Sequence, residues 1–399
     1  MRKLRVLTFT SVYPNAAQPG HGVYTERRLR NLLATGDIES RVVAPVPWVP
    51  AAMRGSRRYG PYYHVPVADR REGIDILYPR YPTVPKIGMT PAPFLMASAL
   101  AGPLRKIARG AFDFDILDAF YFYPDGVAAA ILGRLFDKPV VITAFGSDIN
   151  LIPDHYWPRR MIRWAAGRAA GVTAVCEALK HRLVELGVPA QKIHVILHGV
   201  DLRLFVPPQD RARVQARLGM SRPTLLSVGS LIERKGHHIA IEAMADLPDF
   251  DLLIAGEGEM ERTLRDQVAA LGLGDRIRFL GHVNERDLPA YYGAADALVL
   301  PSSREGIANV LLESMACGTP VIATRVWGAP EVITVPEAGV MMPERTARAL
   351  VDAVRALFAD YPDRAATRRF VERFSWDDTA AQHLAVLQGV MARNGGCGL

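Results

Sequence analysis

Short apolar runs alternate with helix-like segments along this chain, and the alternation starts twice. The first start is the strand-like run Leu4–Thr10, which a loop with two prolines and two glycines joins to an amphipathic segment, Tyr24–Gly36. Ser40–Pro45 is the next strand-like run, which completes the unit from which parallel doubly wound sheets are built. The second start is Thr224–Val228. The sequence therefore predicts an α/β fold with two Rossmann-like, doubly wound domains facing each other across a cleft.

The remaining elements follow from the same periods. Further strands are predicted at Asp115–Ala119, Pro139–Thr143, Gly171–Val175, Ile193–Leu197, Asp251–Ala255, Ile277–Leu280, Ala297–Leu300 and Val321–Ala323. Helices are predicted at Phe94–Leu104, Gly126–Leu135, Arg159–Ala170, Ile239–Ala245, Met260–Leu271 and Leu288–Ala294. We expect the proline-rich segment Pro45–Pro91 to be an irregular, functional or mobile loop. A boundary near His198 divides the chain into domains at 1–198 and 199–376, followed by the segment 377–399.

The net charge of +7 is unevenly distributed. Residues 1–199 carry 26 Lys and Arg against 15 Asp and Glu, a net +11, whereas residues 200–399 carry 22 against 26, a net −4. A basic half indicates an anionic partner. Its basic residues are interleaved with Trp, Tyr and Pro and match no nucleic-acid motif, which favours an anionic membrane surface over nucleic acid. The suspected contacts are Arg54, Arg57, Arg58, Arg105, Lys106 and Arg109.

Three scattered cysteines, Cys176, Cys317 and Cys397, fit a reducing compartment rather than a disulfide framework. The first residues are basic and then apolar, but Pro14 closes the apolar run early, so it indicates a strand rather than a signal peptide. No run approaches the ~18 apolar residues that a membrane span needs. We expect a cytoplasmic protein located peripherally at the inner face of the membrane.

The stretch Ser302–Pro320 combines a polar loop with a short helix, Asn309–Ala316, which Gly318 ends. Backbone N–H groups at a helix start bind anions, and Glu305 and Glu313 add carboxylates that hold hydroxyl groups. A sugar nucleotide offers both a diphosphate and hydroxyls. The alternative is an ordinary turn whose glutamates are solvated or favour the helix dipole.

Two other segments end at the same predicted sheet edge, namely Gly229–Gly236 and Gly256–Gly258. Ligands of doubly wound domains lie outside the carboxyl ends of the strands. Lys235 supplies a positive charge for phosphate there, with Arg234 beside it. The coincidence of these groups with Ser302–Asn309 predicts a nucleotide-sugar site.

Two segments of the first half carry aspartates that are candidates for metal or ligand contact. Asp113 and Asp115 have an acid-x-acid spacing, but they lead into a strand rather than follow one, so a metal role is disfavoured. The run Ala144–Asp148 follows the carboxyl end of a strand and is better placed for ligand contact.

The residues then resemble a known family. Glu305–Glu313 resembles the E-x7-E signature of the retaining GT-B glycosyltransferases of family 4, and EGIANVLLESMACGTPVIAT matches the family pattern over most of its length. VGSLIERKG resembles the family's phosphate-binding loop and HGVDLRLF its interdomain segment. SVYPNAAQPGHGVYTERRLRNL, LDAFYFYPDG, TAFGSDINLIP and FSWDDTA are similar to a bacterial subset that builds exopolysaccharide or teichuronic-acid-like polymers.

The resemblance implies transfer of a sugar from a nucleotide-diphosphate donor, with retention and without a cofactor or bound metal. It implies that Lys235 holds the diphosphate, that Glu313 accepts the ribose hydroxyls and that Glu305 holds the transferred sugar, so Glu305 and Lys235 are the catalytic candidates. It also implies that a final helix, Asp377–Met391, crosses back onto the first domain. The donor-binding candidates are Gly20, Gly22, Ser230, Arg234, Lys235, Gly256, Gly258, Ile307, Ala308, Asn309, Val310 and Glu313.

The chain departs from the family pattern at four residues. Relatives often have Arg where this chain has Ser230 and His where it has Phe120. They usually have His or Arg at the position of Phe145 and commonly Asn at that of His198. Arg234 is expected to compensate for the cation absent at Ser230. Phe120, Phe145 and Asp148 are the acceptor-side candidates, and the acceptor is expected to be a lipid-linked glycan or an oligosaccharide. Two alternatives are a nucleotide-sugar epimerase or hydrolase, and a non-catalytic sugar-nucleotide-binding or assembly subunit.

Overall fold

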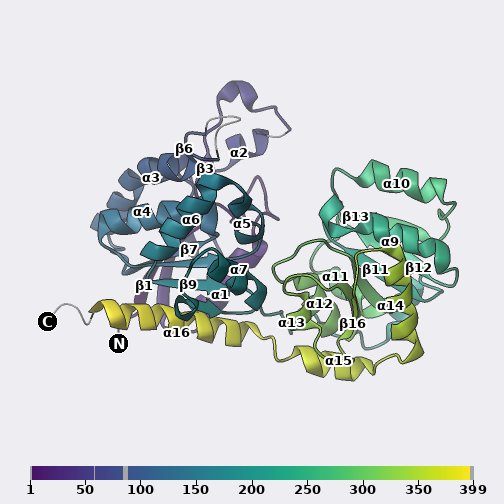
Figure 1. Ribbon diagram of the computed structural model, residues 1–399. Coiled ribbons are helices and arrows are strands. Elements are labelled where there is room, and N and C mark those ends of the chain that lie inside the picture. Colours follow the sequence, from purple (N-terminus) through teal and green to yellow (C-terminus); the bar gives the residue numbers. More distant parts are fainter. Residues whose placement is uncertain (1, 58, 84–88, 396–399) are drawn as a thin grey trace. The chain divides into compact units, whose positions relative to one another are not determined.

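The computed structural model describes residues 2–57, 59–83 and 89–395. The chain forms two compact units: unit 1 contains residues 1–197 and 377–399, and unit 2 contains residues 198–376 (Figure 1). Each unit is a sheet with helices on its faces.

Unit 1 contains a sheet of eight strands in the order β10-β9-β8-β7-β1-β2-β5-β4. Every pairing is parallel except that of β4 with β5. The strands are β1 (Leu4–Phe9), β2 (Ile38–Val43), β4 (Ala68–Arg71), β5 (Ile74–Leu77), β7 (Ile116–Phe120), β8 (Val140–Ala144), β9 (Gly171–Ala174) and β10 (Ile193–Val195). β7 and β8 are buried along their whole length, as expected for central strands of a parallel sheet.

The helices predicted for unit 1 are present with bounds that differ by a few residues, whereas the helices Ser147–Asn150 and Glu177–Glu185 were not predicted. The helices are α1 (Val23–Ala34), α3 (Ala92–Arg109), α4 (Val127–Phe136), α5 (Ser147–Asn150), α6 (Tyr156–Arg168), α7 (Glu177–Glu185) and α16 (Trp376–Gly395), with short turns η2 (Phe122–Gly126), η3 (Ile152–Asp154) and η4 (Ala190–Lys192). Figure 1 shows α3, α4 and α6 on one face of the sheet and α16 along the other. Leu384, Leu387 and Val390 of α16 share a buried cluster with Val6 and Ile116 of the sheet.

The segment 45–91 is not the irregular loop that its prolines predict. It contains β3 (Val46–Pro47), η1 (Ala51–Met53), α2 (Gly60–His64) and β6 (Arg80–Tyr81) in addition to β4 and β5. β4 and β5 extend the main sheet as an antiparallel pair, with Arg70 opposite Asp75. Ile74 and Ile76 pack in a buried cluster with Tyr13 and Val42, which explains why the chain adopts strands there. Residue 58 and residues 84–88 lie outside the described residues.

Unit 2 contains a six-stranded, fully parallel sheet in the order β13-β12-β11-β14-β15-β16. The strands are β11 (Thr224–Val228), β12 (Asp251–Ala255), β13 (Ile277–Gly281), β14 (Ala297–Leu300), β15 (Val321–Thr324) and β16 (Gly339–Met342). The helices and helical turns are α8 (Arg211–Leu218), η5 (Glu233–Lys235), α9 (His237–Ala243), η6 (Met244–Asp246), α10 (Glu261–Ala270), α11 (Leu288–Ala294), α12 (Asn309–Ala316), α13 (Ala329–Val332), α14 (Ala347–Ala359) and α15 (Arg364–Val371). α8, α13, α14, α15 and β16 were not among the predicted elements.

A buried polar chain joins α16 to the rest of unit 1. Arg28 of α1 donates from Nε to Nδ1 of His383 at 3.3 Å, and Nε2 of His383 lies 3.1 Å from the Asp118 carboxylate at the middle of β7. Because Nδ1 accepts, the proton of the neutral ring is on Nε2, where it faces Asp118. Burial lowers the pKa of Arg28 to about 10, so it remains charged at neutral pH. These three side chains are almost fully buried and fix the register of α16 against the sheet.

Candidate functional site

Three loops of unit 2 meet at the carboxyl ends of β11, β12 and β14. The Gly229 amide donates to Ala255 O at 3.0 Å and the Leu231 amide to Glu257 O at 2.9 Å, which joins the first loop to the second. The Ser303 amide donates to Arg234 O at 2.9 Å, which joins the third loop to the first. The structure therefore brings together Gly229–Gly236, Gly256–Gly258 and Ser302–Asn309, as the strand order predicts.

Two glycines allow this close backbone approach. A Cβ at Gly256 would lie 1.9 Å from Gly229 O, and a Cβ at Gly236 would lie 2.0 Å from Pro301 O. Both residues also have positive φ, at +143° and +76°, a region that favours glycine. Gly258 approaches Leu231 in the same way, with its Cβ position 2.4 Å from Leu231 O.

Glu305 is the charge centre of these loops. Its Oε1 accepts from Lys235 Nζ at 2.7 Å and from Ser302 Oγ at 2.8 Å, and its Oε2 lies 3.1 Å from Arg234 Nη1. The carboxylate side chain is only 11% exposed. Burial opposes ionisation, but the two cations outweigh it and hold the pKa of Glu305 below its ordinary value. Glu305 is therefore ionised at neutral pH and forms ion pairs with Lys235 and Arg234.

Arg234 and Lys235 are placed differently around that carboxylate. Arg234 Nη1 also donates to Arg304 O at 2.7 Å, and its side chain is 34% exposed, whereas Lys235 is 14% exposed. The Lys235 stem runs along Gly229, whose Cβ position is 3.3 Å from Lys235 Cε. Ser230, beside Gly229, is exposed at the start of the same loop.

The other glutamate, Glu313, is on α12 and 9% exposed. The hydroxyl of the buried Tyr292, from α11, donates to its Oε2 at 2.9 Å. The printed contacts of the two acids therefore differ: Glu305 pairs with Lys235 and Arg234, and Glu313 accepts from the Tyr292 hydroxyl.

The start of α12 presents backbone amides. Ile307 and Ala308 are buried, Asn309 and Val310 are half-buried, and within the described residues no side chain caps the helix start. Asn309 Oδ1 lies 3.0 Å from Nδ1 of His198. Helix-start amides without side-chain caps remain available to an anionic ligand.

His237, at the start of α9, is a part of this site that the sequence reasoning missed. It is 1% exposed, its Nδ1 lies 2.9 Å from Ser227 Oγ, and its Nε2 lies 3.3 Å from Ser230 O. The carbonyl accepts only, so Nε2 carries the proton and Nδ1 accepts from the serine. Burial and the nearby Lys235 lower the pKa of His237 to about 4. A lone histidine after a glycine gives no sequence signal of this role.

His237 should make stability pH-dependent. Its pKa is lower in the folded protein than in the unfolded chain, so the unfolded chain takes up a proton first as the pH falls. The contribution of neutral His237 to the free energy of unfolding is fully present above pH ~6.5. It is lost as the pH falls towards ~4, and the loss is at most about 3 kcal/mol. We expect the stability deficit of His237→Gln to be largest at pH 7.5 and to shrink by pH 4.5, as measured by urea unfolding. The exposed His282→Gln is the control; a deficit that does not change with pH would contradict the assignment.

The glycines of the first loop in unit 1 are not equivalent. Gly22 precedes α1 with φ +76°, and its Cβ position lies 2.4 Å from Val12 O, so the loop requires glycine there. Gly20 has nothing within 4 Å of its Cβ position. The loop is shaped by Asn15, whose side chain accepts from the Ala17 and Gln18 amides.

Phe120 and Phe145 belong to an aromatic cluster at the carboxyl ends of β7 and β8. Phe120 is fully buried and Phe145 is 7% exposed, with ring centroids 5.6 Å apart. Tyr121 stacks on Phe145 at 5.4 Å, and its hydroxyl lies 3.0 Å from that of Tyr24. The partly exposed rings of this cluster are therefore those of Tyr24 and Tyr121, whereas Phe120 and Phe145 are buried.

Asp148, the third acceptor-side candidate, has its carboxylate directed at the backbone. It accepts from the amides of Phe122 at 2.8 Å and Gly146 at 2.7 Å, and it is 1% exposed. Asp125 has a similar role, accepting from the Ser11 amide at 2.7 Å and the Ser11 hydroxyl at 2.9 Å, and burial raises the pKa of Asp125 to about 7. The sequence reasoning did not identify Asp125, because a single aspartate before a helix is common.

The acid-x-acid pair of unit 1 is engaged in ion pairs. Asp113 pairs with Lys138 at 3.1 Å, and Asp115 accepts from Arg2 and from the Arg5 amide. Over the described ranges, no group of three or more His, Cys, Asp or Glu is arranged to hold a metal ion.

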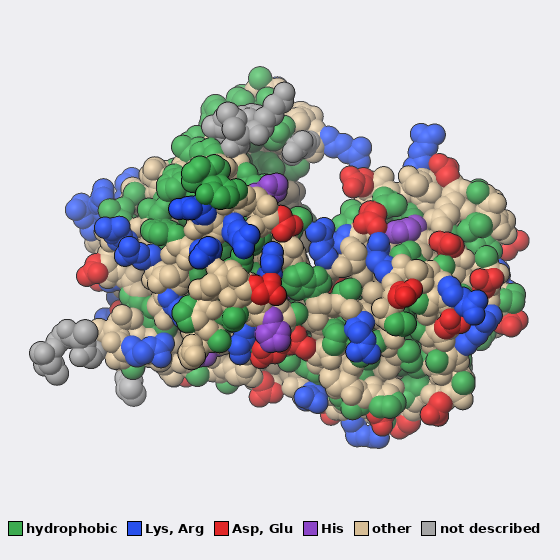
Figure 2. Space-filling model, in the orientation of Figure 1, with side chains coloured by type: hydrophobic (Ala, Val, Ile, Leu, Met, Phe, Trp, Pro, Cys, Tyr) green, Lys and Arg blue, Asp and Glu red, His purple; other side chains and the backbone are tan. Residues whose placement is uncertain are grey.

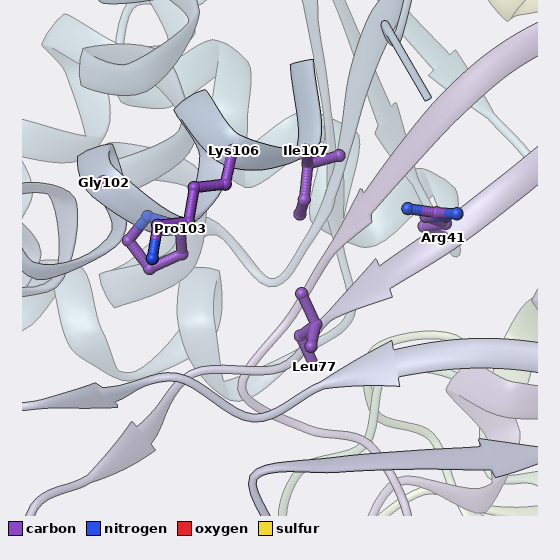
Figure 3. A pocket seen from close by; sticks show the side chains of 6 residues that line it. All are labelled: Arg41, Leu77, Gly102, Pro103, Lys106 and Ile107. Carbon is purple, nitrogen blue, oxygen red and sulfur yellow. The ribbon is translucent and has the colours of Figure 1, made fainter. Parts of the chain in front are cut away.

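A pocket of unit 1, about 430 Å³ in volume, lies between β2, β5 and α3. Figure 3 shows Arg41 on one side, Pro103 and Lys106 on the other, and Leu77 between them. Arg41 lies over the Phe112 ring at 5.2 Å. Among the described residues, none of the predicted catalytic, donor-binding or acceptor-side residues lines this pocket. The pocket is therefore separate from the three loops around Glu305.

Comparison with known proteins identifies the family. Residues 208–373 match the model for group 1 glycosyl transferases, and residues 20–204 match the model for glycosyltransferase family 4. The teichuronic acid biosynthesis glycosyltransferase TuaC of Bacillus subtilis is 30% identical over 88% of each chain. The colanic acid biosynthesis glycosyltransferase WcaL of Escherichia coli is 32% identical over 66% of this chain and 65% of that protein.

Among solved structures, the HepE protein of Anabaena in complex with UDP-glucose superposes with a TM-score of 0.72 at 21% identity, over 97% of this chain and 100% of that one. This likeness confirms the predicted architecture of two Rossmann-like parallel sheets. The chain is therefore a member of the family 4 glycosyltransferases and has the GT-B fold.

Proposed function

We propose that the protein transfers a sugar, with retention at the anomeric carbon, from a nucleotide-diphosphate donor to a lipid-linked glycan in cell-surface polysaccharide synthesis. The observation that carries this is the arrangement of Glu305, Lys235 and Arg234 beside the start of α12. The names of the relatives TuaC and WcaL support the polysaccharide context, and the UDP-glucose bound to HepE supports a nucleotide-sugar donor.

The donor diphosphate would bind to Lys235 and Arg234, the two cations at Glu305. Lys235 and Arg234 both direct their charge at Glu305. A diphosphate placed at the helix start would share these cations and accept from amides at 307–310. Fixed cations and amides stabilise the charge that develops on a departing diphosphate. We infer that they supply the positive charge that a metal ion would otherwise provide, so no metal is required.

The two glutamates would recognise the two ends of the donor. Glu313, which already accepts from the Tyr292 hydroxyl, would accept the ribose hydroxyls. Glu305 would turn towards hydroxyls of the transferred sugar once the diphosphate shares its cations. Glu305 and Lys235 are then the residues that contact the reacting group.

The acceptor side is proposed to lie in unit 1. The half-buried rings of Tyr121 and Tyr24, which pack on Phe145, offer apolar surface with hydroxyls at its edge, which suits a sugar ring. Asp148 would act by shaping the loop that carries Phe145. We propose a lipid-linked acceptor at the anionic inner membrane surface. Of the helices in the described ranges, none is long and apolar enough to span a bilayer.

Donor binding tests the proposal directly. A thermal-shift screen with UDP-, GDP- and ADP-sugars should raise the midpoint for one nucleotide class, since a specific ligand stabilises the folded state. Product formation with membrane extract as acceptor then separates transfer from epimerisation, hydrolysis or binding alone. Absence of a shift with every donor would contradict a sugar-nucleotide site.

Arg234 provides a finer test of the phosphate loop. We expect Arg234→Ala to weaken donor binding by ~10-fold or more, because one charge-assisted bond to a diphosphate is worth about 1.5–3 kcal/mol. Titration calorimetry with the nucleotide found in the screen measures this. Arg262→Ala, at a side chain that is 95% exposed in the same unit, should leave the affinity unchanged. Equal affinities for wild type and Arg234→Ala would show that Arg234 does not compensate for Ser230.

A further inference from the structure

Helix α6 of unit 1 has one buried face and one strongly basic, aromatic face. Its inward residues are Pro158, Ile162, Ala165 and Ala166. Its 13 residues contain four arginines and no acid. We call the outward set the α6 face, and all its members are exposed: Tyr156, Trp157, Arg159, Arg160, Arg163, Trp164 and Arg168.

The aromatic rings of the α6 face protrude into solvent. Tyr156 is 64% exposed, Trp157 58% and Trp164 38%. At 3.6 residues per turn, Trp157 and Trp164 lie on one line along the helix. Arg160 lies over the Tyr156 ring at 5.7 Å, within the aromatic sector. Exposed large aromatics grouped in this way mark an interaction surface.

The arginines flank that sector. On a helical wheel, Arg159 and Arg163 lie on one side of the three rings and Arg168 on the other. The acid next to the helix, Asp154, is 3.6 Å from Arg182 of α7. Figure 2 shows Lys and Arg side chains mixed with hydrophobic ones over the part of unit 1 where Figure 1 places α6.

We propose that the α6 face is the surface by which the protein docks on an anionic lipid bilayer. Trp and Tyr rings partition to the level of the headgroups, where one end is apolar and the other hydrated. Arginines on both sides then meet anionic headgroups, and the helix lies in the plane of the interface. This deepens the membrane location proposed above by naming the surface responsible.

The basic cluster of α3 does not have this composition. Its Arg105, Lys106 and Arg109 are at the carboxyl end of the helix, while its exposed ring, Phe94, is at the other end, roughly 20 Å away at 1.5 Å per residue. Lys106 lines the pocket of Figure 3. The α3 cluster is therefore the matched control, with the same kind of charge and without adjacent rings.

Vesicle co-sedimentation with the full chain tests the proposal. At low salt, wild type should bind vesicles of phosphatidylcholine with about a third phosphatidylglycerol, and bind pure phosphatidylcholine much more weakly. Trp157→Ser with Trp164→Ser, and separately Arg159→Gln with Arg163→Gln, should each reduce binding ~10-fold or more. Arg105→Gln with Arg109→Gln should bind like wild type. All the changed side chains are exposed, so unchanged melting temperatures check that the variants fold.

The outcomes separate the inference from the proposed function. Wild-type binding by both α6 variants, or loss of binding in the α3 variant alone, would overturn the α6 assignment and leave the membrane location standing. Failure of wild type to bind any vesicle would overturn both, while donor binding and transfer to a soluble acceptor would still support the enzyme. A loss of DNA or RNA binding in the α6 variants, with vesicle binding kept, would assign the face to nucleic acid instead.

Discussion

Glu305→Gln is expected to reduce the transfer rate at least ~10²-fold while the protein remains folded. Glutamine matches the size of glutamate and can still accept from Ser302, but it carries no charge to hold Lys235 and Arg234. Both cations would then lack their buried counter-ion, and the sugar hydroxyls would lose their anionic acceptor. The measurement is kcat with the donor identified by thermal shift, and kcat should fall far more than donor affinity.

Glu233→Gln is the matched control for that experiment. Glu233 is on the same loop as Lys235, but its carboxylate is 66% exposed and pairs with Arg345 at 2.7 Å. The Arg345 guanidinium lowers the pKa of Glu233, so the control also removes a paired anion. Its rate should stay within about twofold of wild type, because exposed pairs contribute little. Near-wild-type turnover by Glu305→Gln would exclude Glu305 from the reacting group.

The two sheets were largely predictable because their strands are buried on both faces. Thr224–Val228 and Asp251–Ala255 are mainly apolar runs of strand length, and the structure has the same bounds. The hairpin of β4 and β5 was not predictable in this way, because β4 is an edge strand of Ala, Asp and two arginines. Its pairing depends on β5, a short apolar run within the proline-rich segment, and on the buried cluster around Tyr13, which is distant in sequence.

The meeting of the three loops was predictable, but the direct contacts within them were not. Strand order places Lys235 and Glu305 at one sheet edge, 70 residues apart. Their ion pair depends on how closely Gly236 approaches Pro301, a backbone detail that sequence spacing does not fix. Several buried polar residues were not predicted, namely His237, Asp125, Arg28 and His383. Each is a common residue type whose role depends on burial and on partners that are distant in sequence.

The charge asymmetry of the sequence assigns an expected anionic partner to the first half of the chain, but it does not single out a surface. On charge alone, any of the 26 basic residues of the first half could serve an anionic partner, since a count ignores what lies beside each one. The structure distinguishes them by exposed rings, which accompany the arginines of α6 and not those of α3. Aromatic exposure is a property of the fold, so the sequence alone could not rank the two helices.

Gly256→Ala is expected to destabilise the protein by at least about 3 kcal/mol and to impair donor binding. The added methyl would lie 1.9 Å from Gly229 O, at a residue with φ +143°. Backbone atoms cannot move aside as a flexible side chain can, so the loop Gly229–Gly236 must shift. That shift would displace Lys235, whose stem runs along Gly229. Urea unfolding measures the stability, and calorimetry with the donor measures the affinity.

Gly272→Ala separates the steric effect from the backbone penalty. Gly272 ends α10 with φ +64°, and nothing lies within 4 Å of its Cβ position. An alanine there has no steric clash, so the only expected effect is the strain of a left-handed backbone conformation, about 1–2 kcal/mol. It should lower stability by that amount and leave donor affinity unchanged, because Gly272 follows the carboxyl end of α10, about 15 Å along the helix from the loop Gly256–Gly258. Suppose that both variants lower the free energy of unfolding by the same amount and that both bind the donor as tightly as wild type. Then the close contact between Gly256 and Gly229 does not position the phosphate loop.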